Sequence, residues 1–221
     1  MQRSLVGSEM CIRDRGRTVE LKLFRGNDVI MLEYKDFEEK TIERKELFKG
    51  KIIDVYLDDV SLPMGGTAKR ELVFHHGGVG IIPITKENKM IMVKQFRKPL
   101  EKVVLEIPAG KIDPGEGQHP EKTAVRELEE ETGYRTENLM YINEMYLSPG
   151  FSNEKLYIYT ATDLVKVENP KPQDEDEVLE LYELTMEEAK QAIHDGLICD
   201  AKTIFAVNYW ELMHYRKEDH A

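Results

Sequence analysis

The sequence predicts an α/β protein, in which a mixed sheet lies between helices and a small antiparallel β unit precedes it. Two observations lead to this prediction. Stretches of β-branched and apolar residues typical of strands run through most of the chain, and helical stretches of different lengths interrupt and follow them. Such interleaving is typical of the α/β class. With 221 residues and 41% hydrophobic content, the chain can bury one good core and a small accessory unit.

Residues 1–30 carry no periodic apolar pattern and no apolar signal-peptide region. The stretch SLVGSEMCIRD matches one reading frame of a common sequencing adapter, which indicates that residues 1 to about 15 are an assembly artefact. We therefore expect residues 1–30 to be a disordered, non-native extension, with Met31 as the natural start. The alternative is a real N-terminal arm with a strand in VELKLF.

The next elements follow in order. A small antiparallel β unit with a tight turn at MGG is expected from TIERKELF, KIIDVYLDDVSL and TAKRELVFHH. Further strands are expected in GVGIIPIT, KMIMVKQFR, VVLEIPAG, NLMYINEMYL, EKLYIYTATDL and VLELYEL. A short helix, MEEAKQAIHDGL, is closed by Gly196, and a longer helix follows in DAKTIFAVNYWELMHYRK.

The stretch HPEKTAVRELEEETGY predicts a helix of about three turns, because Pro120 suits its first turn and Gly133 suits the position after its end. At 100° per residue, one side of this helix is apolar enough to face the core. That side carries Ala124, Val125, Leu128 and Thr132.

Four glutamates crowd this helix. Glu127, Glu130 and Glu131 share a face beside the apolar side, while Glu129 points roughly opposite Glu127. Each like-charged pair costs about 0.2–0.5 kcal/mol, and Arg126 offsets only part of this because it lies one turn from Glu130 and away from Glu127. Carboxylates without a protein counter-charge suit a hard divalent cation. The alternative is a solvated acidic helix face.

The helix and the loop before it, EIPAGKIDPGEGQ, together resemble the Nudix box. Its defined positions are filled by Gly110, Glu116, Arg126, Glu127, Leu128, Glu130, Glu131, Gly133 and Tyr134. The spacer between Glu116 and Arg126 has nine residues, whereas the family has seven. The extra pair is most simply Gly117 and Gln118, which leaves the helix undisturbed. The resemblance implies the Nudix fold.

The chain is also similar to the ADP-ribose pyrophosphatase branch of that family, whose mark is a proline about 15 residues after the box. Pro149 stands there. This resemblance implies a Mg²⁺-dependent enzyme, with Mn²⁺ as a possible substitute, that splits ADP-ribose into AMP and ribose 5-phosphate. It implies an N-terminal β unit at 31–76 that exchanges across a homodimer, and a hydrolase domain at 77–221.

Site residues follow from the same resemblance. It implies metal binding by the Ala109 carbonyl, Glu127, Glu131 and Glu177, and catalytic roles for Glu175 and Glu130. Substrate binding is implied for Arg70, Arg97, Glu71, Pro149 and Gly150. The alternatives are a solvated acidic turn for residues 174–177 and ordinary strand-edge ion pairs for the two arginines, such as Arg70 with Glu71.

Composition limits the other functions. A net charge of −11 argues against a nucleic-acid partner, and no apolar run approaches the length of a membrane span. Two unpatterned cysteines, Cys11 and Cys199, fit a cytoplasmic enzyme better than a disulfide framework. Two further functions stay open: the same cleavage of another nucleoside diphosphate sugar or a dinucleotide, and a non-catalytic sensor of ADP-ribose. The intact glutamate set favours an enzyme.

Overall fold

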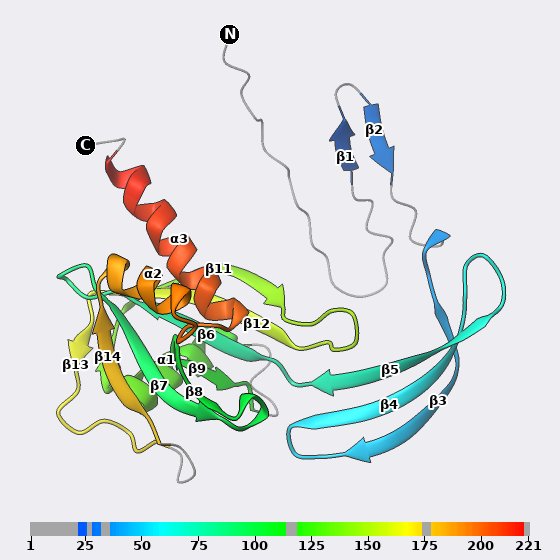
Figure 1. The fold of residues 1–221 in the computed structure, drawn as a ribbon, viewed down its shortest axis with the longest axis horizontal. Helices are drawn as coiled ribbons and strands as arrows, with labels where there is room; N and C mark the ends of the chain where they lie inside the picture. Colours follow the sequence, from blue (N-terminus) through cyan, green and yellow to red (C-terminus); the bar gives the residue numbers. More distant parts are fainter. Residues whose placement is uncertain (1–21, 26–27, 32–35, 114–118, 174–177, 219–221) are drawn as a thin grey trace. The chain divides into compact units, whose positions relative to one another are not determined.

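The structure, a computed structural model, describes residues 22–25, 28–31, 36–113, 119–173 and 178–218 (Figure 1). The chain divides into two compact units. The first unit comprises residues 1–45 and 57–71, and the second comprises residues 46–56 and 72–221. None of the described helices is long and apolar enough to cross a membrane.

Two short strands, β1 (Lys22–Arg25) and β2 (Asp28–Met31), form an antiparallel hairpin. Residues 1–30 were expected to be disordered throughout, whereas the structure has strands at 22–25 and 28–31. The sequence signal for the first strand is VELKLF, whose alternating apolar residues include the start of β1. The hairpin has two strands only, and an isolated pair of this kind is marginally stable in water.

A three-stranded sheet in the order β3-β4-β5 follows, as expected for the N-terminal β unit. Its strands are β3 (Lys40–Lys49), β4 (Ile53–Ser61) and β5 (Thr67–His75). Within the first unit, Asp58 of β4 accepts hydrogen bonds from Arg44 and Thr41 of β3. Asp58 is buried, so these two donors compensate the loss of water around its carboxylate.

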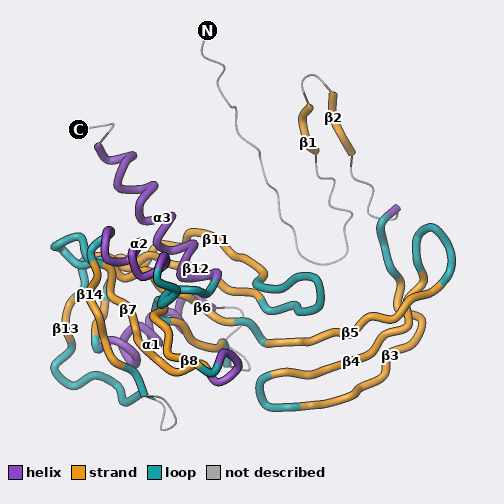
Figure 2. Tube along the Cα trace, viewed as in Figure 1, coloured by secondary structure: helices purple, strands orange, loops and turns teal. Residues whose placement is uncertain are grey.

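Within the described residues, the second unit contains a four-stranded sheet, a three-stranded sheet and three α-helices, and Figure 2 distinguishes helices from strands by colour. The four-stranded sheet has the order β11-β12-β6-β9; β12 and β6 are parallel and the other pairs are antiparallel, so the sheet is mixed. The three-stranded sheet β14-β7-β8 is antiparallel. The strands are β6 (Gly78–Pro83), β7 (Met90–Arg97), β8 (Lys102–Glu106), β9 (Ala109–Lys111), β11 (Asn138–Tyr146), β12 (Lys155–Thr162) and β14 (Glu180–Leu184), with a small pair, β10 (Tyr134–Arg135) and β13 (Val165–Lys166).

Helices cover both faces of these sheets. Along β6, Val79 and Ile81 pack with Ala124 and Leu128 of α1 (Pro120–Thr132), because alternate side chains of a strand point to opposite faces. Ile82 packs on the other face, in a second cluster to which α2 (Met186–His194) and α3 (Ala201–Glu218) contribute. The predicted α/β class, with a mixed sheet between helices, is confirmed.

The helix α1 begins and ends where the sequence predicts. Pro120 occupies its first turn, and Gly133 takes the left-handed conformation after its end, with φ 70°. One detail of its expected buried side is wrong: Val125 is 38% exposed, whereas Thr123 is fully buried. The apolar side is therefore rotated by part of a turn from the expected one.

The stretch VVLEIPAG was expected to form one strand, but the structure divides it into β8 and β9, which belong to different sheets. Pro108 lies at the break and has no N–H to donate to a ladder. The break turns the chain from one sheet to the next at the point where the Ala109 and Gly110 backbone meets α1. It therefore shapes the candidate site.

Candidate active site

A cavity of about 670 Å³ opens in the second unit. Its described lining joins residues that are far apart in sequence. Among those expected to be functional, it includes Arg97 of β7, Ala109 of β9, and Glu127 and Glu131 of α1. Gly110, Glu106, Arg126, His75, Asp200 and Lys202 also line it.

The backbone at Gly110 lies against the carboxylate of Glu127. A Cβ atom built on Gly110 would stand 1.8 Å from the carboxyl carbon of Glu127 and 2.0 Å from its Oε1, which is far inside van der Waals contact. Glycine at this position therefore allows the close approach of the Glu127 carboxylate, which any larger residue would displace. The Glu127 carboxylate is held between helix and strand at the rim of the cavity.

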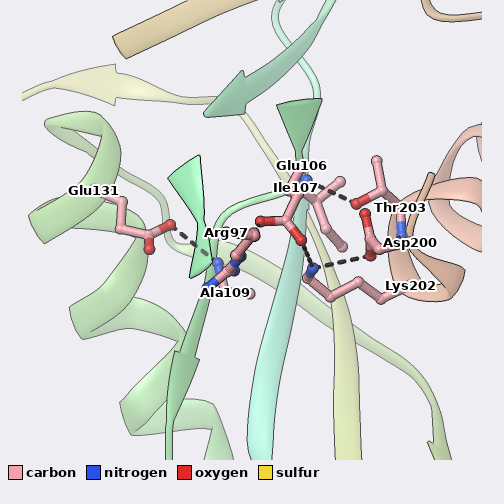
Figure 3. Close-up of polar contacts among 8 residues, drawn as sticks. All are labelled: Arg97, Glu106, Ile107, Ala109, Glu131, Asp200, Lys202 and Thr203. Carbon is pink, nitrogen blue, oxygen red and sulfur yellow. Dashed lines mark hydrogen bonds and ion pairs between the residues drawn. The ribbon is translucent and has the colours of Figure 1, made fainter. Parts of the chain in front are cut away.

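Glu131 is tied to the same strand. Its Oε2 accepts a hydrogen bond of 3.0 Å from the backbone N–H of Ala109. The residue is only 3% exposed, yet it lines the cavity. Figure 3 shows Glu131 reaching from α1 toward the Ala109 backbone. The two carboxylates predicted as metal ligands thus meet the peptide segment whose carbonyl was predicted to join them.

Arg126 neutralises more of this acidic face than expected. Its Nη1 lies 2.8 Å from Oε1 of Glu127 and 2.7 Å from Oε2 of Glu130. The expectation that Arg126 points away from Glu127 was wrong, because a long arginine side chain can reach around the helix even though adjacent residues diverge. Glu130, by contrast, is absent from the described lining of the cavity.

Glu129 behaves as a structural residue. Its carboxylate accepts hydrogen bonds from Nε and Nη2 of Arg135, at 2.6 Å and 2.9 Å, and a third from the backbone N–H of Lys171. The Arg135 guanidinium lowers the pKa of Glu129 below its ordinary value, against the opposing effect of burial. Glu129 does not contribute to the described cavity lining.

A chain of opposite charges crosses the other side of the cavity lining (Figure 3). Nε of Arg97 donates to Oε2 of Glu106 at 2.6 Å, and Nζ of Lys202 donates to Oε1 of the same carboxylate at 2.7 Å. Lys202 also donates to Oδ1 of Asp200 at 2.9 Å. Arg97, which was predicted to bind substrate, thus has a partner that fixes one edge of its guanidinium group.

His75 also lines the cavity. Its Nδ1 accepts a hydrogen bond of 2.9 Å from the backbone N–H of Gly77, so the ring is held against the chain. Burial lowers the pKa of His75, and nearby Glu154 opposes this shift. This shift favours the neutral form of the imidazole.

The described lining of the large cavity does not include the other predicted residues. Pro149 and Gly150 line a separate cavity of about 210 Å³, whereas Leu147 and Ser148 just before them line the large one. Arg70 and Glu71 belong to the first unit. Arg70 is paired with Glu39, through an Nε–Oε2 distance of 2.8 Å, and not with Glu71 as the ion-pair alternative suggested. Glu116, Glu175 and Glu177 lie outside the described residues.

The donors present suit a hard divalent cation that shares its ligands with substrate. Within the described part of the chain, no group of three or more His, Cys, Asp or Glu side chains is arranged to hold a metal by itself. Two buried carboxylates, Glu127 and Glu131, do line one cavity beside the Ala109 and Gly110 backbone. Mg²⁺ is typically bound by one or two carboxylates together with phosphate oxygens, so this partial set fits.

Comparison with known proteins identifies the class to which this fold and site belong. Residues 74–204, more than half of the chain, match the NUDIX domain family. The chain belongs to the Nudix family and is a Nudix hydrolase.

Two relatives are similar over most of their length. The chain is 48% identical to an ADP-ribose pyrophosphatase of Bacillus subtilis (strain 168), over 80% of this chain and 95% of the relative. It is 51% identical to a methanol dehydrogenase activator of Bacillus methanolicus, over 80% of this chain and 94% of the relative. A solved structure of an ADP compounds hydrolase matches with a TM-score of 0.70 and 20% identity, over 83% of this chain and 97% of that one. The predicted Nudix fold is confirmed.

Sequence reasoning missed Glu106, Asp200 and Lys202 as cavity residues. A signal was present, because Glu106 is a charged residue at the end of the apolar stretch VVLEIPAG. A carboxylate in such a strand is buried and needs a cation. The sequence did not say which of the 31 lysines and arginines supplies it.

Proposed function

We propose that this Nudix hydrolase cleaves ADP-ribose to AMP and ribose 5-phosphate with Mg²⁺, for which Mn²⁺ can substitute. One observation carries the proposal: two buried carboxylates of α1 and the guanidinium group of Arg97 line the same cavity. Carboxylates suit a cation and a guanidinium suits phosphate oxygens, so the pair suits a diphosphate. ADP-ribose is chosen among diphosphates because of the 48% identical pyrophosphatase.

The cavity is large enough for such a substrate. Its volume of about 670 Å³ lies in the range of pockets that bury most of a nucleotide-sized ligand. Its described lining carries four cationic residues, Arg97, Lys111, Arg126 and Lys202, and six carboxylates, Glu106, Asp113, Glu127, Glu131, Glu154 and Asp200. A dianionic diphosphate would therefore bind there together with a cation that offsets the excess negative charge.

Each part of the site has a defined task in this proposal. Glu127 and Glu131 hold the cation, and the Gly110 backbone keeps Glu127 in place. Arg97 binds phosphate oxygens and holds the diphosphate in line with the attacking water. A cation bound there supplies charge neutralisation of the phosphoryl oxygens and lowers the pKa of a bound water.

The base is proposed on the resemblance of residues 174–177 to a family loop, and those residues lie outside the described ones. We assign Glu175 as the base and Glu177 as a further metal contact, with Glu130 as the alternative base. Glu175→Gln should then slow turnover with little change in Mg²⁺ dependence, and higher pH should restore part of the rate. Glu177→Gln should instead raise the Mg²⁺ concentration for half-maximal rate. Reversed phenotypes would exchange the two roles.

A homodimer is part of the proposal. The edge strand β3 exposes the apolar side chains of Ile42, Leu47 and Phe48, and exposed apolar edges are normally covered. A second copy could cover them and bring Arg70 and Glu71 to a substrate. Sedimentation of the purified protein tests this, and a monomer at micromolar concentration would contradict it. The predicted cytoplasmic location stays a prediction.

The substrate is tested by a panel of diphosphates with purified protein and Mg²⁺. The panel includes ADP-ribose, nucleoside diphosphate sugars and NAD, and products are separated by ion exchange. We expect the highest kcat/KM with ADP-ribose, and AMP with ribose 5-phosphate as products. A higher value for another member would replace the substrate but keep the reaction, and no cleavage of any member would refute the proposed cleavage of nucleoside diphosphates.

The 51% identity to a methanol dehydrogenase activator favours a second candidate, in which the hydrolase acts on a dehydrogenase or its cofactor. Dehydrogenases commonly use dinucleotides, which contain the same diphosphate bond. This is why NAD belongs in the panel. Faster cleavage of NAD than of ADP-ribose would favour the second candidate.

A further inference from the structure

The start of α3 is fastened to the end of β8 by several polar contacts. Oγ1 of Thr203 accepts a hydrogen bond of 3.1 Å from the backbone N–H of Ile107. Oδ1 of Asp200 accepts one of 3.1 Å from the backbone N–H of Thr203, which is the arrangement of a helix N-cap. Lys202, between them, reaches Glu106 at 2.7 Å. Figure 3 shows these residues converging on the strand end.

The Lys202–Glu106 pair is buried, which is unusual for an ion pair. Residue exposure is 7% for Lys202 and 3% for Glu106. Desolvation of two charges costs several kcal/mol each, so a well-packed apolar pair is often as stable as a buried ion pair. The pair is therefore weak as an explanation of stability. Since both residues line the cavity, a role in the site is the better explanation.

The geometry at Glu106 indicates what that role is. Each of its two oxygens has a different cation: Oε2 accepts from Nε of Arg97, and Oε1 accepts from Lys202. An arginine facing a free carboxylate usually binds both oxygens through two nitrogens. Here Lys202 donates to Oε1, and Arg97 is bound through Nε alone. Among the described residues, its two terminal nitrogens have no hydrogen-bond partner.

We infer that Lys202 is a positioning residue for diphosphate binding: it shares the negative charge of Glu106 through its contact with Oε1, so that the carboxylate attracts the terminal nitrogens of Arg97 less and they are left to the substrate. Asp200 orients the lysine through its 2.9 Å contact. The inference rests on the proposed function, because it assumes that Arg97 meets a phosphate in the cavity. Without Lys202, Arg97 binds Glu106 through Nε and a terminal nitrogen, and Glu106 then competes with the substrate for that nitrogen.

The test is Lys202→Met, which keeps length and removes the charge. Using the best substrate of the panel, KM should rise about tenfold or more while kcat changes by less than about threefold, since ground-state binding is what is lost. Lys190→Met is the matched control. Lys190 forms an ion pair of 2.7 Å with Glu211 between α2 and α3, away from the cavity lining, and KM should not change.

A double variant separates action through Arg97 from direct contact with substrate. In an Arg97→Met background, Lys202→Met should raise KM by less than about twofold further, because the group that it positions is gone. Equal effects of Lys202→Met with and without Arg97 would overturn the inference. So would an unchanged KM in the single variant with unaltered Arg97.

A crystal structure of the Lys202→Met variant without substrate decides the geometry independently of activity. It should show Arg97 bound to both oxygens of Glu106, and the wild-type arrangement retained in the variant would overturn the inference. If Lys202→Met does not fold, Lys202→Ala, which removes both the donor and the charge, takes its place in all three measurements. Failure of the panel assay with wild-type protein would refute the proposed function alone, because the crystal structure still tests the arginine geometry.

Discussion

Glu129 and Glu131 lie two positions apart on α1 and are almost equally buried, with 2% and 3% exposure. Their surroundings differ in kind. Glu131 lines the cavity and bonds the Ala109 backbone, whereas Glu129 is bound to Arg135. Helical spacing separates them, because positions two apart face different directions. The two residues are therefore a matched pair for separating catalysis from stability.

Glu131→Gln should lower kcat by roughly 10²-fold or more while the protein stays folded, since it removes a charge for cation binding without changing size. Glu129→Gln should instead lower the free energy of unfolding by about 1–3 kcal/mol, because Arg135 loses its charged partner, and change kcat by less than about threefold. Initial rates in Mg²⁺ and denaturant unfolding of both variants measure this. A near wild-type rate for Glu131→Gln would remove it from the metal site.

Gly110 lends itself to a second test at this scale. Gly110→Ala places a methyl group where the Glu127 carboxylate now lies, with 1.8 Å between the new Cβ and the carboxyl carbon. The flexible glutamate can move, so we expect a small loss of stability but a displaced ligand. The Mg²⁺ concentration for half-maximal rate should rise about tenfold or more. Metal titrations measure it, and an unchanged midpoint would mean that Glu127 does not bind the cation.

For single residues, the sequence could predict which glutamates are candidate metal ligands, but it could not predict which charged side chains form ion pairs. The spacing of Glu127 and Glu131 placed both beside the core, as the structure has them. The pairing of Glu106 with Lys202 joins positions 96 residues apart in sequence, and no local pattern encodes it. The contact between Arg126 and Glu127 was missed because helical spacing predicts only the direction of each Cβ atom. The guanidinium group at the end of a long arginine side chain can lie well away from that direction.

The elements show the same division between local and non-local information. Helix α1 has the predicted first and last residues because a proline and a glycine mark its ends. The stretch VVLEIPAG could not be divided by pattern alone, since both parts are apolar. Pro108 was the one local indication of a break between the two strands. The break itself depends on pairing, because β8 pairs with β7 in one sheet and β9 pairs with β6 in another.

The β3–β4 pair offers a pH test. Hydrogen bonds from Arg44, and then from Thr41, hold the pKa of Asp58 below its ordinary value despite burial. Because the pKa is lower in the folded state, Asp58 stabilises the protein fully above its ordinary pKa, and this contribution is lost as pH falls through the folded-state value. Asp58→Asn should therefore destabilise the protein near neutral pH and weaken the dependence of its stability on pH below about pH 4.

Denaturant unfolding at several pH values between neutral and acidic measures that slope. Asp59→Asn is the control next in sequence, since Asp59 is 40% exposed and its ion pair with Lys69 should contribute little. Equal acid sensitivity in wild type and Asp58→Asn would contradict the prediction.

For the molecule as a whole, the α/β class and the Nudix fold could be predicted because periodicity identifies most elements and the box identifies the site. The division into two compact units could not be predicted from the sequence, because the boundary between the units crosses β3, β4 and β5. Residues of one strand then belong to different compact units. Such a boundary depends on which contacts form between distant segments, and composition does not change across it.

The proposal that residues 1–30 are a non-native extension belongs to this scale. As far as the structure describes them, both core clusters are built from residues between Val79 and Trp210. A two-stranded hairpin contributes little by itself. A chain starting at Met31 should therefore keep its melting temperature within about 2 °C and its kcat/KM within about twofold. Thermal unfolding, initial rates and sedimentation of both chains measure this at equal concentration. If the shortened chain melts well below the full one, or changes its oligomeric state, the hairpin is a native arm and VELKLF is its strand.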